Sequence, residues 1–154
     1  MEFTGERVVP GKVEPDLLNE HLSRYLFARG FASSRQVLDL GCGTGYGSAI
    51  LAESAMSVVA VDISRETIAY ARENYAQPGI NFLVANCTQL PVRSESLDLV
   101  VCFEVVEHLS EQERLLDEIS RVLKQDGLLV ISTPNRLYYT EERQEINPYH
   151  TREF

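Results

Sequence analysis

The chain of 154 residues is long enough for one domain with a buried core, and its hydrophobic fraction of 44% is ordinary for a globular protein. Its net charge of −9 argues against nonspecific binding to nucleic acid or to an anionic membrane. No apolar run approaches the length of a membrane span, and residues 1–6 lack the basic and apolar regions of a secretion signal. The three cysteines are an odd number, which favours reduced thiols, and these features together predict a cytoplasmic protein.

The first thirty residues predict an irregular arm followed by one helix. Leucines recur at helical spacing between Pro15, which suits a first helical turn, and Gly30, which ends the helix. Two interpretations remain open. The helix either packs on the rest of the domain, or closes with the arm over a ligand whose polar end Arg24 or Tyr25 would approach.

A glycine-rich turn follows the first predicted strand and leads into the next helix. Residues 37–47 read Val-Leu-Asp-Leu-Gly-Cys-Gly-Thr-Gly-Tyr-Gly. Glycine has no Cβ, so such a turn can take positive φ and let a ligand contact the main chain. The free N–H groups at a helix start also favour an electron-rich ligand atom. In doubly wound parallel sheets, a turn of this kind holds a nucleotide-like cofactor.

The spacing of these glycines excludes two common nucleotide motifs. A dinucleotide fingerprint G-x-G-x-x-G that began at Gly41 would need glycine where Tyr46 stands. One that began at Gly43 would need glycine where Ser48 stands. No Gly-Lys-Ser/Thr follows, so the turn is not a Walker phosphate loop either. The pattern is Asp-x-Gly-x-Gly-x-Gly, led by Asp39.

A second buried strand, residues 57–62, ends in an acid about 20 residues beyond the glycine turn. An acid at this place accepts hydrogen bonds from ribose hydroxyls in nucleotide-binding sheets. Asp62 could instead be an acid at a helix N-terminus, because Ser64 and Glu66 begin a helix there. The glycine turn before it favours the ribose role, which would place Ile63 against the adenine face.

Three further apolar segments complete the predicted sheet. They are residues 81–85, which lead to a polar tip at 86–88, residues 97–103, and residues 128–133. The middle segment is almost continuously apolar, as expected for a central parallel strand covered on both faces. Because strands alternate with helices, we predict an α/β fold: a doubly wound parallel sheet in the order 3-2-1-4-5 with helices on both faces.

Local signals set two boundaries in the second half. Ser110 and Glu113 form a capping-box pattern, which predicts the start of a helix, and residues 125–127 predict a turn before the last strand. We expect one domain over 1–154, with the arm and helix at 1–30, the core at 34–134 and the start of a C-terminal part at 135–154.

Four separate stretches of this chain resemble the class I S-adenosylmethionine (AdoMet) dependent methyltransferases, of the type 11/12 kind. They are residues 37–47, 61–63, 97–109 and 123–135. The resemblance implies AdoMet as the cofactor, with its methionine part held by Asp39, Gly41 and Gly43. It implies further cofactor contacts at Tyr25, Cys42, Tyr46, Asp62 (ribose), Ile63 and Cys87 (adenine), Asn86, Thr88 and Phe103 (near the sulfonium). Asn86 departs from the family, in which an acid often accepts from the adenine amino group; an amide oxygen can still accept, without charge assistance.

The segment Glu-Val-Val-Glu-His at residues 104–108 follows the fourth strand. Its acids and histidine stand at i, i+3 and i+4, so a helical turn would put them on one face. Methyl transfer is an in-line displacement, and an acceptor that loses a proton needs a base or a metal ion. The candidate catalytic residues are therefore Glu104 and His108.

The same segment resembles the metal motif of the small-RNA 3′-terminal methyltransferases and is similar in the quinone-pathway O-methyltransferases. That resemblance implies a divalent metal ion held by Glu104, Glu107, His108 and His150. Glu-x-x-Glu-His is also common in metal-free methyltransferases, where His108 would act as a base or orient the loop, and we favour this second interpretation.

The function that the resemblance implies is methyl transfer to an oxygen or nitrogen of a small-molecule or glycan-type acceptor. The alternatives are a non-catalytic AdoMet- or nucleotide-binding module and a metal-dependent RNA 3′-terminal 2′-O-methyltransferase. A nicotinamide-dependent oxidoreductase is a further alternative, against which the glycine spacing argues. The family usually has two more strands after the fifth, and this chain stops before them, whether it is naturally short or truncated. We therefore expect an exposed edge on the fifth strand, through which the chain could self-associate.

Overall fold

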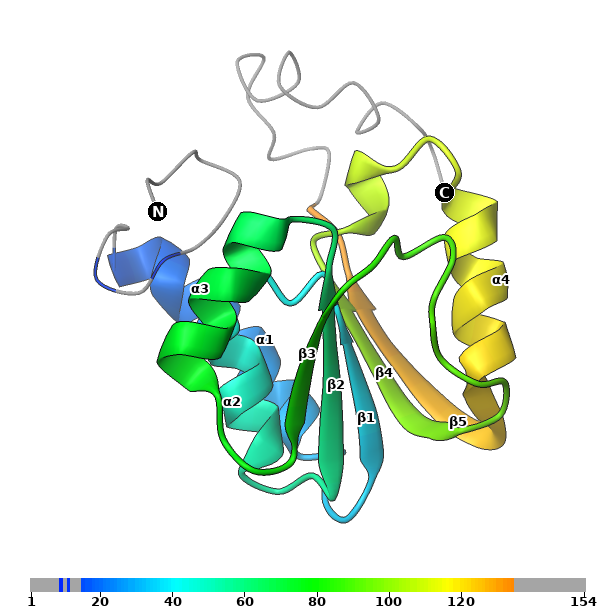
Figure 1. Ribbon diagram of the computed structural model, residues 1–154, viewed down its shortest axis with the longest axis horizontal. Coiled ribbons are helices and arrows are strands. Elements are labelled where there is room, and N and C mark those ends of the chain that lie inside the picture. Colours follow the sequence, from blue (N-terminus) through cyan, green and yellow to red (C-terminus); the bar gives the residue numbers. More distant parts are fainter. Residues whose placement is uncertain (1–8, 10, 12–14, 135–154) are drawn as a thin grey trace.

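The computed structural model describes residues 9, 11 and 15–134, and it confirms the predicted α/β fold (Figure 1). Five strands form one sheet in the order β3-β2-β1-β4-β5, and all neighbouring pairs are parallel. The strands are β1 (Gln36–Leu40), β2 (Ser57–Asp62), β3 (Ile80–Val84), β4 (Leu97–Phe103) and β5 (Leu123–Ser132). The helices are α1 (Pro15–Arg29), α2 (Tyr46–Ala52), α3 (Arg65–Tyr75) and α4 (Gln112–Val122), with a short 3₁₀ turn, η1 (Val106–His108).

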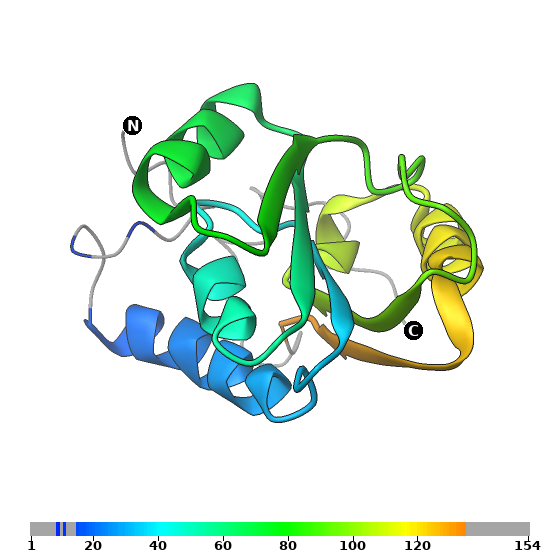
Figure 2. The ribbon, with the colours of Figure 1, turned by 60° about the horizontal axis from the view of Figure 1, so that its bottom comes forward.

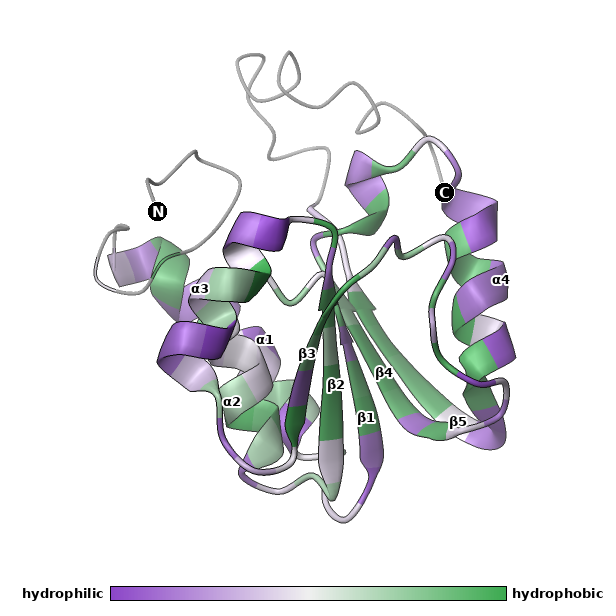
Figure 3. Ribbon diagram, viewed as in Figure 1, coloured by the Kyte–Doolittle hydropathy of each residue, from purple (hydrophilic) through white to green (hydrophobic). Residues whose placement is uncertain are grey.

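Helices cover both faces of the sheet and divide the buried side chains into two cores. In both ribbon views α1, α2 and α3 lie on one face, and α4 lies on the other (Figure 1, Figure 2). The first core contains residues of α1, α2 and α3, and the second contains residues of α4. Because side chains alternate along a strand, Val37 of β1 faces the first core and Leu38 faces the second. Strands are accordingly apolar along most of their length, while polar residues gather on the outer sides of the helices (Figure 3).

The strand order decides where a ligand site can form. The chain leaves β1 in one direction toward β2 and β3, and returns on the other side to β4 and β5. Parallel strands bring their carboxyl ends to the same edge, the upper edge in Figure 1. In such sheets, ligands bind in the crevice at the point where the strand order reverses. Here that point lies between β1 and β4.

The predicted start of α4 is confirmed near Ser110 but its predicted cap is not, and the prediction for the start of β5 is wrong. The N-cap of α4 is Glu111, with no side-chain cap hydrogen bond, so the capping box of Ser110 and Glu113 does not form. Gln112 instead donates from its side chain to the Val106 carbonyl, 3.1 Å away, and joins the start of α4 to η1.

The predicted turn at residues 125–127 lies inside β5 rather than before it. The strand begins at Leu123, which pairs with Leu97, and the next pair along is Leu128 with Leu99. Residues 124–127 therefore form an irregular bulge in a ladder that has already begun. Within the described residues β5 is an edge strand, and none of the helices there is both long and apolar enough to cross a membrane.

One aromatic side chain joins α1 to the glycine turn. The buried Tyr25 ring packs edge-on against Phe103, with ring centroids 5.2 Å apart, and against Tyr46, at 5.7 Å. A Cβ added to Gly47 would lie 2.0 Å from Cζ of Tyr25. Position 47, the last glycine of the motif, therefore has to lack a side chain, because α1 and α2 approach each other closely there.

We predict that Gly47→Ala destabilises the protein by about 1–3 kcal/mol, because the added methyl group forces the Tyr25 ring out of its packed position. The free energy of unfolding in urea measures this. In a Tyr25→Ala background the same change should be neutral or stabilising by up to about 1 kcal/mol, because alanine favours the helix interior over glycine. An equal loss in both backgrounds would contradict the assignment.

Candidate functional site

One position in the glycine turn faces open space. Gly41, Gly43 and Gly45 all have positive φ, at 75°, 53° and 90°. A Cβ on Gly41 would meet Val105 at 2.3 Å, and one on Gly45 would meet α3 at 2.8 Å. A Cβ on Gly43 would have no atom within 4 Å. Gly43 is therefore the place where a ligand can contact the main chain of the turn.

The carboxylate of Asp62 lies directly beside that position. The Gly43 amide donates to Asp62 Oδ2 at 3.1 Å, and the Ser64 amide donates to Oδ1 at 2.8 Å. Ser64 is also the N-cap of α3, so Asp62 both adjoins a helix N-terminus and faces the turn. A carboxylate has about four lone-pair sites, so acceptor capacity remains for ligand hydroxyls.

Asp39 lies beneath the turn and is almost fully buried, at 1% exposure. Ser48 donates to its Oδ2 at 2.6 Å, and the Tyr25 hydroxyl donates to its Oδ1 at 3.2 Å. Burial raises the pKa of the Asp39 carboxyl to about 6. Asp39 thus holds α1 and α2 against the underside of the turn.

Four other residues predicted to contact the cofactor lie together near the turn. Tyr25, Cys42, Tyr46 and Phe103 are all buried, and the three rings contact one another through Tyr25. Burial raises the pKa of the Cys42 thiol and of the Tyr25 hydroxyl, so both groups are neutral at physiological pH. All four belong to the hydrophobic core on the side of the sheet that α1, α2 and α3 cover.

The tips of β2 and β3 provide an apolar and a polar surface. Ile63 is 68% exposed immediately after Asp62. The amide of Ala85 donates to the Asp62 carbonyl at 3.1 Å, so the two tips are joined.

The side-chain oxygen of Asn86, Oδ1, makes hydrogen bonds within its own turn. It accepts from both the amide and the hydroxyl of Thr88, at 3.0 Å each. That it accepts from an adenine amino group stays a prediction, because the Thr88 hydroxyl can rotate away and leave one lone pair of Oδ1 for a ligand. Thr88 and the half-buried Cys87 complete this turn.

The candidate catalytic acid, Glu104, is fixed at the end of β4. It has a left-handed backbone, with φ of 55°. Its amide donates to the Ser132 carbonyl at 3.0 Å, and the Ser132 hydroxyl donates to Glu104 Oε1 at 2.7 Å. Sequence reasoning missed Ser132, although a hydroxyl at the tip of the neighbouring strand was a usable signal.

Arg24 of α1 also lies near the Glu104 carboxylate. Its Nη2 lies 3.7 Å from Glu104 Oε1. Its Nη1 is buried and has no hydrogen-bond partner among the residues that the structure describes. A buried guanidinium nitrogen without a partner is costly, which indicates a place for an anionic ligand group.

Glu107 and His108 do not share a helical face with Glu104, because only residues 106–108 form the 3₁₀ turn. Glu107 is buried, at 2% exposure, and accepts from the Thr133 hydroxyl at 3.2 Å. Burial raises the pKa of the Glu107 carboxyl to about 7, and the nearby Glu104 charge raises it further. The His108 side chain is 44% exposed, with Nε2 3.9 Å from Glu107 Oε1.

The predicted metal ligands are only partly described. Over residues 15–134, together with 9 and 11, no three His, Cys, Asp or Glu side chains are grouped so that they could hold a metal ion. His150, the fourth predicted ligand, lies outside the described residues.

Asp39 gives the protein a pH-dependent stability. Its pKa is about 6 in the folded state against a usual 3.8, so between these values the folded state binds more protons and stability falls as pH rises. About two pKa units correspond to roughly 3 kcal/mol. We predict that the free energy of unfolding of Asp39→Asn, relative to wild type, rises by roughly this amount from pH 4 to pH 7.

Urea titrations at several pH values measure this difference, and Asp98→Asn is the control. A hydrogen bond from Lys124 and one from the Gln36 amide lower the pKa of Asp98, so its stabilisation is complete above the usual pKa of 3.8. That variant should differ from wild type by a constant amount above about pH 5. A constant difference for Asp39→Asn as well would contradict the role of burial.

Comparisons with known proteins agree with this geometry. A family model described as a methyltransferase domain matches residues 38–131. A probable S-adenosylmethionine-dependent methyltransferase of Mycobacterium tuberculosis is 40% identical over 99% of this chain and 56% of that protein. A ubiquinone biosynthesis O-methyltransferase of Coxiella burnetii is 30% identical over 82% of this chain and 55% of that protein.

A solved structure, the YcgJ protein of Bacillus subtilis, shares the fold with a TM-score of 0.75 at 22% identity, covering 86% of this chain and 62% of that one. The chain spans little more than half the length of the curated relatives it matches. The family model covers more than half of the chain, and the Mycobacterium relative aligns with nearly all of it. The chain therefore belongs to the methyltransferase domain family.

Proposed function

We propose that this chain is the AdoMet-binding part of a methyltransferase, and that it transfers a methyl group to an oxygen or nitrogen of a small-molecule or glycan-type acceptor. The observation that carries the proposal is the hydrogen bond from the Gly43 amide to the Asp62 carboxylate, at the open position of the glycine turn. It joins a bare main-chain surface to an acceptor for ribose hydroxyls, which a nucleoside cofactor requires.

The cofactor would lie across the ends of β1, β2 and β3. Asp62 would accept from the ribose, since its carboxylate keeps lone pairs beyond those used by Gly43 and Ser64. The exposed Ile63 would pack on the base, with Cys87 and Thr88 at its edge. The methionine part would extend over Gly43 toward Arg24, whose buried Nη1 would bind its carboxylate.

The residues after β4 supply the reaction chemistry. AdoMet, when bound, provides a methyl group on a sulfonium, and the protein must align an acceptor with it. Glu104 is fixed by Ser132, so its charge stays near the end of Phe103 and favours a cationic group there. His108 is exposed enough to take a proton from an acceptor, and the buried Glu107 stands 3.9 Å from it to orient the ring.

An oxygen acceptor is the better supported choice. One relative is named for O-methylation in ubiquinone biosynthesis, and an acceptor hydroxyl needs the proton acceptor that His108 offers. The metal-dependent RNA 2′-O-methyltransferase has less support, because the chain carries a net charge of −9. The second candidate is a non-catalytic AdoMet-binding module, which would bind the cofactor without transferring its methyl group.

The proposal is tested by calorimetry with S-adenosylhomocysteine, with and without magnesium or manganese. We expect metal-independent binding, and a loss of at least about tenfold in affinity for Asp62→Asn, because one accepting oxygen becomes an NH2 donor that can accept neither from the main-chain amide beside it nor from a ribose hydroxyl. A methyl-label screen over sugars, phenols, amines and small RNAs then separates enzyme from binding module. Wild type that ignores S-adenosylhomocysteine would overturn the proposal.

Arg24→Met tests the end of the site that would hold the methionine part. The affinity for S-adenosylhomocysteine should fall about tenfold, because a charge-assisted hydrogen bond to its carboxylate is lost. Affinity for adenosine, which lacks that carboxylate, should not change. The matched control is Arg29→Met on the same helix, where the arginine pairs with the exposed Glu53. A similar loss of affinity for S-adenosylhomocysteine and for adenosine would show that Arg24 does not bind the carboxylate of the methionine part.

A further inference from the structure

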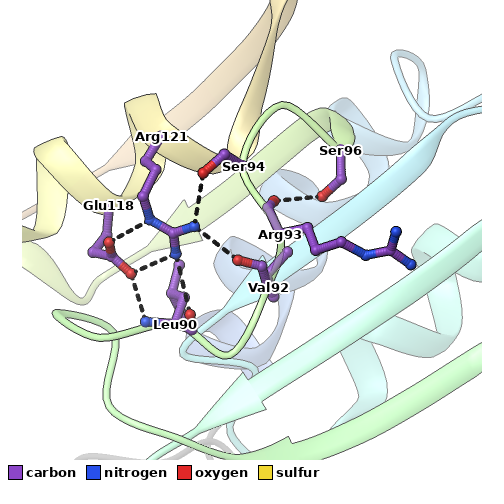
Figure 4. Close-up of polar contacts among 7 residues, drawn as sticks. All are labelled: Leu90, Val92, Arg93, Ser94, Ser96, Glu118 and Arg121. Carbon is purple, nitrogen blue, oxygen red and sulfur yellow. Dashed lines mark hydrogen bonds and ion pairs between the residues drawn. The ribbon is translucent and has the colours of Figure 1, made fainter.

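On the face of the sheet opposite α1, α2 and α3, an arginine of α4 binds the connection between β3 and β4 (Figure 1, Figure 4). All five N–H donors of Arg121 are used. Nε and Nη2 donate to the two carboxylate oxygens of Glu118, at 2.6 and 2.8 Å. The other donations go to the Leu90 carbonyl at 3.1 Å, the Val92 carbonyl at 2.8 Å and the Ser94 hydroxyl at 3.3 Å. We refer to Glu118 and Arg121 together as the α4 clamp.

The α4 clamp holds the main chain of Leu90 on both of its polar groups. Glu118 Oε2 accepts from the Leu90 amide at 2.6 Å, while Arg121 donates to the Leu90 carbonyl. The Leu90 side chain is buried in the second core. The ion pair lowers the pKa of Glu118 and raises that of Arg121, so both groups stay charged over the physiological range. Leu90 is therefore fixed by its backbone and its side chain.

Leu90, which the α4 clamp fixes, stands two positions after the turn at 86–88. On its other side that turn is tied to β2, because the Ala85 amide donates to the Asp62 carbonyl. Within it, the Gln89 amide donates to the Asn86 carbonyl at 3.0 Å. The 86–88 turn is therefore held on both sides: Ala85 before it bonds to the Asp62 carbonyl, and Leu90 after it bonds to the α4 clamp.

We propose, resting on the function proposed above, that Glu118 and Arg121 are positioning residues for AdoMet, because the α4 clamp fixes the 86–88 turn against the adenine base. Neither side chain touches the cofactor. They act through the main chain of residues 90–94, which leads directly to the turn. Small displacements of groups that bind a ligand edge are costly, so a remote anchor controls how well the base is recognised.

The geometry explains why this anchor is an arginine. A planar guanidinium presents its donors in a fixed fork, which here reaches a carboxylate and three groups of the loop at once. A lysine has three donors at one point and cannot span that set. Arg121→Lys is thus a mild variant that keeps the charge and weakens the loop contacts.

The test compares S-adenosylhomocysteine with S-inosylhomocysteine, in which an oxygen replaces the adenine amino group. For Arg121→Met we expect a Kd for S-adenosylhomocysteine about tenfold higher, and a preference over S-inosylhomocysteine about fivefold smaller than in wild type. Glu118→Gln and Arg121→Lys should shift both quantities in the same direction by smaller factors, and they cover the case in which Arg121→Met does not fold.

Arg114→Met is the matched control. Arg114 pairs with Glu111 at 2.7 Å on the same helix and at the same i,i+3 spacing, with both side chains largely exposed. That variant should match wild type in both quantities. If the α4 clamp variants lower the melting temperature but keep the wild-type preference, or if wild type does not prefer S-adenosylhomocysteine, the inference is wrong. Wild type that binds neither compound would instead overturn the proposed function.

Discussion

The contact between the Gly43 amide and the Asp62 carboxylate fixes the edge of the sheet where the carboxyl ends of β1 and β2 meet. It joins the turn after β1 to the tip of β2, and the amides of Gly41 and Cys42 add two donations to the Val61 carbonyl, at 2.8 and 2.9 Å. Because β1 and β2 are paired in parallel, the two tips are held at a fixed separation. An open main-chain surface and a carboxylate are therefore preorganised side by side before any ligand arrives.

Two groups of residues surround this contact: a buried, hydrogen-bonded group beneath the turn, and an ion pair at the end of β4. Asp39, Tyr25 and Ser48 hold the turn from beneath through buried hydrogen bonds. Glu104 and Arg24 face each other at the neighbouring end of β4, where Ser132 fixes the carboxylate. The residues beneath the turn are buried and hydrogen-bonded to one another, whereas Glu104 and Arg24 form a partly exposed ion pair, so the edge of the sheet offers two chemically different surroundings.

The parts of this arrangement that follow from short-range sequence signals could be predicted. The glycine turn, the acid after β2 and the strand order depend on local spacing and on the rules of parallel sheets, and the contact of Asp62 with Gly43 agrees with them. The parts that depend on partners distant in sequence were missed. Gly47 is constrained by Tyr25, Glu104 by Ser132, and the start of β5 by its pairing with Leu97, and in each case the two residues lie far apart in the chain.

The left-handed backbone of Glu104 has a consequence for how this family member can change. A side chain with positive φ costs conformational free energy, and here the Ser132 contacts offset it. The two positions are therefore coupled, so drift at one is tolerated only with a compensating change at the other. Diversification of this corner should therefore proceed through paired replacements at Glu104 and Ser132.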